Sequence, residues 1–291
     1  MDRNVLRRPL TMADLPAAMT LVTQAGWNQT ISDWARFVNA EPAGCFAASV
    51  DAQLVGTAAT IIYGQLAWVG MVIVDSSYRG RGIGRGLLQS VLEFLDARAI
   101  PCVKLDATPA GKPVYERFGF VDEREILRLA LARPSRGVPR ASSDRATARG
   151  GGAPHALIND VLDLDRQLFG VDRGHLLRSL ADEAPELAIV IRDAAEIIGY
   201  AFGRHGSRAD HLGPWMARDA DAAAVVLDAF LERSDRPLVY VDCIRDNPWA
   251  LRVAAARGFQ LSRALTRMCR GTNRFPGATT YLGGIVGPEF G

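Results

Sequence analysis

Apolar residues along the first half of the chain follow two different periods, which together predict a mixed fold of strands and helices. Residues 83–95 carry apolar side chains at every third or fourth position, the stripe of an amphipathic helix. Shorter β-branched or alternating runs predict strands at 6–9, 45–50, 54–63, 72–74 and 103–106, and two further helices are expected within 12–40. The strands at 45–50 and 54–63 should form a hairpin that turns at Asp51 and Ala52.

The segment between the 72–74 strand and the 83–95 helix is rich in glycine and arginine, and it predicts a phosphate-binding site. Its sequence is RGRGIG over residues 79–84, and Arg85 follows. The first backbone N–H groups of a helix have no partner within the helix, and the helix dipole favours negative charge at that end. The glycines let the backbone approach a ligand closely, and the arginines add positive charge. We therefore expect a phosphorylated ligand at this loop.

Two common phosphate-binding motifs do not fit this loop. P-loop nucleoside triphosphatases place Lys and Ser or Thr after the glycines, whereas this chain continues with Gly86, Leu87 and Leu88. Dinucleotide-binding folds place G-x-G-x-x-G near the start of a βαβ unit, whereas this loop follows several earlier elements. The pattern that fits is R-x-x-G-x-G, formed by Arg79, Gly82 and Gly84.

This loop resembles the pyrophosphate loop of the GNAT acyltransferase superfamily, which binds acetyl-coenzyme A (acetyl-CoA). A second motif lies at the expected distance: after the 103–106 strand, a short helix ends in Y-x-x-x-G-F, from Tyr115 to Phe120, like the last helix of that superfamily. The resemblance covers residues 1–132. It implies an α/β (α+β) fold, in which helices flank a mixed, mostly antiparallel central sheet.

The resemblance also implies a role for the residues of these motifs. The backbone of 72–74 would pair with the pantetheine arm, and the amides from 80 to 85 would bind the pyrophosphate. Tyr115 would protonate the CoA thiolate or donate a hydrogen bond to the sulfur, and a packing tyrosine is the alternative. Thr108 stands where many members carry Asn. The implied cofactor-binding residues are Val72, Ile73, Val74, Arg79, Gly80, Arg81, Gly82, Ile83, Gly84, Arg85, Thr108 and Tyr115.

The general base and the acceptor site have weaker signals. Asp106 ends a strand that should border the site, where its carboxylate could take a proton directly or through water. Its alternative role is to cap the helix that begins near Pro109. Acceptor contacts are expected from the segment after the first helix and from the strand hairpin. These candidates are Trp27, Asn28, Gln29, Asp33, Trp34 and Trp68. Alternatively, Asn28 or Thr30 caps the next helix and the tryptophans belong to the core.

The second half of the chain repeats the first weakly but in order. Its residues Asn247, Ala250, Ala254, Gly258 and Phe259 fall at the spacing of Thr108, Gly111, Tyr115, Gly119 and Phe120. The counterpart of the phosphate loop, residues 213–221, has no G-x-G and contains two aspartates, and Ala254 replaces Tyr115. We therefore expect two tandem GNAT-like modules, of which only the first is active.

The expected domain boundaries follow from composition. Residues 1–132 form the first module and 156–291 the degenerate second one. Between them, 133–155 reads as a flexible linker rich in Arg, Gly and Pro, with a basic arm for an acidic partner as the alternative. The C-terminal sequence GGIVGPEFG is expected to be a surface loop or tail.

Charge and composition exclude several classes of function. The net charge is +2, and the positive excess lies in the linker, so general nucleic-acid binding is not expected. The four cysteines and four histidines show no metal-ligand spacing, so no metal is expected. No run approaches 18 uncharged apolar residues, and the N-terminus lacks a signal-peptide hydrophobic region. A cytoplasmic protein without membrane contact is expected, and a homodimer stays open.

The leading hypothesis is an N-acetyltransferase that transfers acetyl from acetyl-CoA directly to the primary amine of a small molecule or peptide. A non-catalytic acyl-CoA sensor is the first alternative, although a sensor could dispense with Tyr115. A Fem-like aminoacyl transferase is the second. It would not need an intact pyrophosphate loop, and the basic surface expected for tRNA is missing here.

Overall fold

The structure is a computed structural model that describes residues 5–134 and 155–291. Most of the predicted linker, residues 135–154, lies outside these described residues. The first half contains β1 (Leu6–Pro9), α1 (Leu15–Gln24), α2 (Ile31–Ala40), β2 (Phe46–Val50), β3 (Gln53–Tyr63), β4 (Leu66–Val74), α3 (Ile83–Ala97), β5 (Cys102–Ala107), α4 (Lys112–Glu116) and β6 (Val121–Ala132). The helices and strands predicted for this half are confirmed.

The second half repeats this order from α1 onward, and among the described residues it has no counterpart of β1. It contains α5 (His155–Phe169), α6 (Gly174–Glu183), β7 (Ile189–Asp193), β8 (Glu196–His205), β9 (Asp210–Ala217), α7 (Ala220–Arg233), β10 (Leu238–Ile244), α8 (Ala250–Ala255), β11 (Gln260–Gly271) and β12 (Leu282–Gly284). By this order β9 corresponds to β4, α7 to α3, β10 to β5 and β11 to β6. The predicted internal repeat is therefore present, and β12 is an addition to it.

Local signals in the sequence explain several boundaries. The β2–β3 hairpin turns at Asp51 and Ala52, which both have positive φ (49° and 65°), as the twist of a tight two-residue hairpin turn requires. Helix α2 begins at a capping box, in which the Thr30 hydroxyl accepts from the Asp33 N–H and Asp33 accepts from the Thr30 N–H. Of the two caps considered for this helix, Thr30 is therefore the one used.

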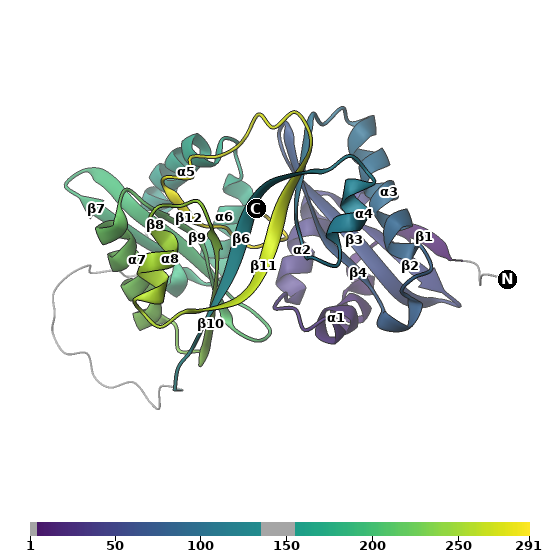
Figure 1. The fold of residues 1–291 in the computed structure, drawn as a ribbon, viewed down its shortest axis with the longest axis horizontal. Coiled ribbons are helices and arrows are strands. Elements are labelled where there is room, and N and C mark those ends of the chain that lie inside the picture. Colours follow the sequence, from purple (N-terminus) through teal and green to yellow (C-terminus); the bar gives the residue numbers. More distant parts are fainter. Residues whose placement is uncertain (1–4, 135–154) are drawn as a thin grey trace.

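One continuous sheet of 12 strands joins the two halves. Its order is β1-β2-β3-β4-β5-β11-β6-β10-β12-β9-β8-β7. On the side away from β4, β5 pairs with β11 from the second half. On the side away from β12, β10 pairs with β6 from the first half. Strands β6 and β11 also pair with each other, and they cross the middle of the molecule between the two halves (Figure 1). The halves have thus exchanged their last strands.

Helices cover both faces of the sheet and enclose three apolar cores. Helix α3 packs on β2–β4, and α7 packs on β7–β9, each in a core formed mainly by its own half and completed by the strand from the other half. The third core is shared, because α1 and α2 meet α5 and α6 there. Phe37 of α2 stacks on Phe290 at the end of the chain, with ring centroids 4.8 Å apart. Burying one such side chain contributes about 1.5–3 kcal/mol, so this shared core holds the halves together. Within the described residues, no helix is long and apolar enough to cross a membrane.

Candidate active site

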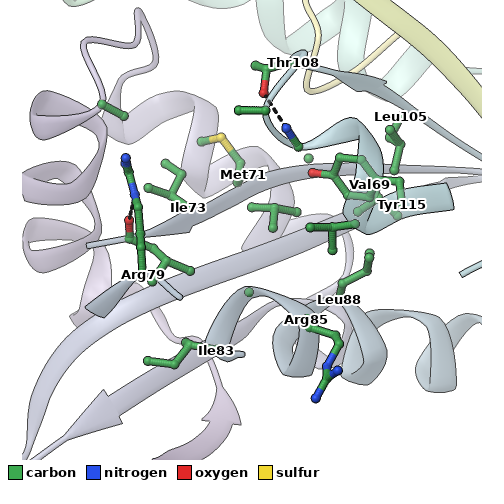
Figure 2. A pocket seen from close by; sticks show the side chains of 18 of the residues that line it. Val69, Met71, Ile73, Arg79, Ile83, Arg85, Leu88, Leu105, Thr108 and Tyr115 are labelled. Atoms are coloured by element: carbon green, nitrogen blue, oxygen red, sulfur yellow. Dashed lines mark hydrogen bonds between the residues drawn. The ribbon is translucent and has the colours of Figure 1, made fainter. Parts of the chain in front are cut away.

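A cavity of about 1100 Å³ opens where strands β4 and β5 separate. The two parallel strands are paired only at their beginnings, from Leu66–Trp68 against Cys102–Lys104. Beyond Trp68 they diverge, so the facing backbone edges of residues 69–74 and 105–107 do not pair with each other. The cavity fills this V-shaped opening and is lined by the glycine-rich loop at one side and by α4 at the other (Figure 2).

A β-bulge in β4 shapes the opening. Met71 has a positive φ of 56°, and the register against β3 shifts between Thr57 and Ala59. The Thr57 hydroxyl donates to the Met71 carbonyl at 2.9 Å and holds this conformation. Bulges twist a strand and re-aim its backbone, and strained φ values in residues with side chains gather at functional sites. The bulge therefore turns β4 away from β5 at the level of the cavity.

The predicted phosphate loop lies at the wide end of the opening. Gly80 and Gly82 both have positive φ (76° and 77°), which favours glycine at these two positions. Gly82 is the N-cap of α3, so no side chain caps the helix. The first hydrogen bond within the helix runs from the Gly86 N–H to the Gly82 carbonyl, which leaves the N–H groups of residues 83–85 without an acceptor in the helix. This helix N-terminus can accept an anion.

Tyr115 lies on α4 with its hydroxyl directed into the cavity (Figure 2). Its ring packs edge-on against Phe120, at 6.1 Å between centroids. Burial raises the pKa of Tyr115 to about 12, so the phenol stays protonated at neutral pH. Thr108 also lines the cavity, and its hydroxyl accepts a hydrogen bond from the Gly111 N–H at 3.2 Å, next to the start of α4.

Asp106 lines the cavity but is paired on both oxygens. The Arg267 guanidinium from the exchanged strand β11 donates to both carboxylate oxygens at 2.9 Å. Burial raises the pKa of Asp106, against the lowering effect of Arg267. In the second half Asp242 on β10 makes the same two-pronged pair with Arg128 on β6, at 2.8 and 2.6 Å. Each exchanged strand is thus tied to its new neighbour by one buried Asp–Arg pair.

Only two of the predicted acceptor residues, Trp27 and Gln29, line the cavity. Asn28 is buried against the second half, where its amide binds backbone groups of Arg208 and Ala209. Asp33 caps α2 and forms ion pairs with Arg36 and with Arg204 of the second half. These two side chains are held in the contact between the halves.

The two remaining tryptophans also lie outside the cavity lining. Trp34 is fully buried in the shared core. Trp68 is buried beneath the Arg267 guanidinium, 4.4 Å from its ring centroid, and its indole N–H donates to the Pro288 carbonyl. Large aromatic side chains in a contact between two packed halves are more readily core than ligand contacts, and the structure places both tryptophans there.

The C-terminal segment is not a surface tail. Residues 282–284 form β12, and Ile285, Val286 and Phe290 are buried in the shared core. Pro288 and Glu289 then reach the cavity. The segment passes so close to β4 that a Cβ on Gly70 would lie 2.9 Å from the Glu289 Cα. The apolar residues among its glycines were the available sign that this segment is buried.

The corresponding opening in the second half is filled by the chain itself. Strand β12 pairs with both β9 and β10 and occupies the place where β4 and β5 leave a cavity in the first half. The N-terminus of α7 is also occupied, because the Asp219 carboxylate caps it by accepting from the Ala222 N–H at 2.9 Å. With Ala254 at the position of Tyr115, this half has no counterpart of the site in the first.

Two family models match the chain, one in each half. Residues 11–120 match the acetyltransferase (GNAT) family, and residues 161–284 match an acetyltransferase (GNAT) domain. The chain is a tandem member of the GNAT acetyltransferase superfamily. Its two GNAT modules account for the internal repeat, and the predicted fold class is confirmed.

Individual relatives agree with this assignment. A Bacillus subtilis protein described as the uncharacterized N-acetyltransferase YitH is 23% identical over 190 residues, which are 65% of each chain and thus just under two thirds of that relative. A putative acetyltransferase from Pyrococcus horikoshii superposes with a TM-score of 0.79 at 22% identity, covering 100% of this chain and 97% of that one. A tandem GNAT protein from the clavulanic acid biosynthesis pathway gives 0.63 at 15% identity, covering 91% and 98%. These structures share the tandem GNAT fold.

Proposed function

We propose that the chain is an N-acetyltransferase that transfers acetyl directly from acetyl-CoA to a primary amine, with one working site in its first GNAT module. The observation that carries the proposal is the continuous path from the uncapped N-terminus of α3 to the opening between β4 and β5. A pyrophosphate on the helix end would leave its pantetheine arm lying along the free edge of residues 72–74. The thioester would then reach the narrow end of the opening.

Tyr115 supports the second part of the proposal, the departure of the CoA thiolate. The pKa of the phenol is raised to about 12, several units above the ordinary thiol value of about 8.5. Complete proton transfer from Tyr115 to the thiolate is therefore uphill. A hydrogen bond from the phenol to the sulfur avoids this cost and still stabilises the negative charge that develops there. Of the two roles expected for Tyr115, the raised pKa favours the hydrogen-bond donor.

Asp106 has less support as the general base. Both of its oxygens are bound by Arg267, and the same pair recurs at Asp242 in a module without a phosphate loop. A repeated pair at corresponding positions is better explained by a shared structural task. We therefore assign Asp106 chiefly to holding β11 against β5.

A calorimetric titration with acetyl-CoA tests the proposal, with one binding site per chain as the expected result. Gly82→Glu should weaken binding at least a hundredfold, because it places a carboxylate in the anion site. Gly64→Glu is the matched control, since Gly64 also has a positive φ (64°) but lies in an exposed turn away from the cavity. Both variants carry the same backbone strain of about 1–2 kcal/mol.

The outcomes distinguish the transferase hypothesis from the acyl-CoA sensor hypothesis. No binding to the wild-type protein would refute the proposal, and two sites per chain would contradict the filled opening of the second module. Binding without release of CoA thiol across a broad panel of amines would favour the acyl-CoA sensor. Release of thiol that depends on an added amine would support the transferase.

A further inference from the structure

Three polar side chains from distant parts of the sequence line the cavity, and two of them have unused hydrogen-bonding atoms. Gln29 follows α1, Arg263 lies on the exchanged strand β11, and Glu289 belongs to the C-terminal segment. The Gln29 amide N–H donates to the Glu289 carboxylate at 2.8 Å, but the Gln29 carbonyl oxygen is buried without a partner. The Arg263 Nε is likewise buried without a partner. Buried polar atoms are nearly always paired, so unpaired ones beside a cavity point to a missing ligand.

Arg263 is a half-buried cation. Its guanidinium makes no hydrogen bond or ion pair with any residue that the structure describes. Partial burial lowers its pKa. It lies opposite Arg128 in the pairing of β11 with β6, and Arg128 already holds both oxygens of Asp242. The charges of Asp242 and Glu289 act on Arg263, but neither carboxylate makes a hydrogen bond or an ion pair with it.

Glu289 belongs to a network of ion pairs in the contact between the two halves. Arg204 binds Glu289 and Asp33, and Arg36 binds Asp33 and Glu183. This connected group contains three carboxylates and two guanidinium groups, and the charges of Arg128 and Arg263 also act on Glu289. Glu289 is the member of the group that faces the cavity, and it is 3% exposed. Glu289 and Arg263 thus bring a carboxylate and a guanidinium group to the lining of the same cavity.

We infer that the acceptor is an amine that also bears an anionic oxygen group, such as an amino acid or a phosphorylated amine. This inference rests on the proposed acetyl-CoA-dependent function and specifies its acceptor. The ammonium group of the acceptor binds between Glu289 and the Gln29 carbonyl oxygen. Its carboxylate or phosphate binds Arg263, in a two-pronged contact that a guanidinium makes well with either group. The second module, which has no site of its own, supplies Arg263, Glu289 and Arg204 to the first.

The test measures acetylation of paired amines that differ only in the anion. Glycine is compared with glycinamide and β-alanine with β-alaninamide for a carboxylate, and glucosamine 6-phosphate with glucosamine for a phosphate. The wild-type protein should favour the anionic member of at least one pair by tenfold or more in kcat/KM. Arg263→Gln should remove that preference by raising KM for the anionic member, while kcat/KM for the neutral member changes less than threefold.

Two further variants keep the test informative. Arg252→Gln, at an exposed position on α8 away from the cavity, is the matched control and should leave the preference unchanged. Arg263→Leu should leave the free energy of unfolding unchanged or raise it, because it removes a half-buried charge that makes no hydrogen bond or ion pair with the described residues. An arginine whose task is structural would instead lower stability when replaced.

Each outcome decides the matter. The inference is overturned if the wild-type protein prefers no anionic member, if Arg263→Gln keeps the preference, or if Arg263→Leu destabilises the protein as a structural residue would. If the wild-type protein acetylates none of the paired amines, N-acetylglycine and its amide are titrated into the CoA complex. The inference is overturned in that case too if the complex shows no preference for the acid. Failure to bind acetyl-CoA would instead refute the proposed function.

Discussion

The exchange of strands makes a sharp prediction about the buried pair of Asp242 and Arg128. We expect Asp242→Ala to lower the free energy of unfolding by about 3–5 kcal/mol, the usual cost of removing one partner of a buried ion pair. Arg128 is only 4% exposed, and its neighbour across the strands, Arg263, is already unpaired. The substitution would therefore leave the buried Arg128 guanidinium without its counter-charge and next to a second cation. That loss is a large part of a typical total stability of about 5–15 kcal/mol.

The second module offers a matched control for this measurement. Asp228 and Arg257 also form a two-pronged pair, but the Asp228 side chain is 55% exposed. Asp228→Ala removes the same chemical group and should cost about 0–1 kcal/mol, because water replaces the lost contact. Replacing both buried partners, as in Arg128→Leu with Asp242→Leu, should recover most of the lost stability, since no charge is then left buried.

Urea unfolding followed by tryptophan fluorescence and circular dichroism would measure these differences. The chain carries tryptophans in both halves, for example Trp68 and Trp215. Because one sheet runs through both modules, we expect Asp242→Ala to shift a single transition seen by both methods. The reasoning fails if Asp242→Ala costs no more than Asp228→Ala, or if the second module unfolds alone while the first stays folded.

Two further predictions concern catalysis and pH. Tyr115→Phe should keep the affinity for acetyl-CoA, measured by calorimetry, and lower kcat by about 10²-fold or more, because it removes a donor from the leaving sulfur; unchanged turnover would exclude Tyr115 from the mechanism. Burial raises the pKa of Asp242, but the charge and hydrogen bonds of Arg128 outweigh burial and lower it from 3.8 to about 2. A lowered pKa stabilises the fold above the unfolded value, so this contribution should be complete above about pH 4 and lost as the pH falls towards 2. Acid-unfolding curves of Asp242→Asn should lack that part of the pH dependence, and a curve identical in shape to that of the wild-type protein would contradict the assignment.

The positions of the glycine-rich loop, the hairpin turn and the helix cap could be predicted from the sequence. The glycines at 80 and 82 have positive φ, the hairpin turns at Asp51 and Ala52, and Thr30 begins α2, all within short stretches whose side chains determine the backbone. The same holds for the loss of the second site, because Asp219 and Ala254 replace the groups that a cofactor would need.

The residues proposed to contact the acceptor could not be predicted in this way. Asn28 and Trp34 occupy a segment of the expected composition, but they are turned into the contact between the modules. Arg263 stands in a strand with no motif around it, and Glu289 stands in a glycine-rich segment expected on the surface. Their meeting depends on contacts between residues more than 200 positions apart, such as that of Gln29 with Glu289.

The sequence by itself determined the elements, their order in each module, and the glycine-rich loop before α3, because periodicity, glycine and capping residues act over a few neighbouring positions. Only the tertiary structure decided which strands pair and what completes the cavity. Backbone hydrogen bonds in a sheet do not depend on side-chain identity, so β6 and β11 could satisfy either module. The exchange and the path of the C-terminal segment are selected by buried pairs and packing between distant residues. That selection places Arg263 and Glu289 of one module in the site of the other.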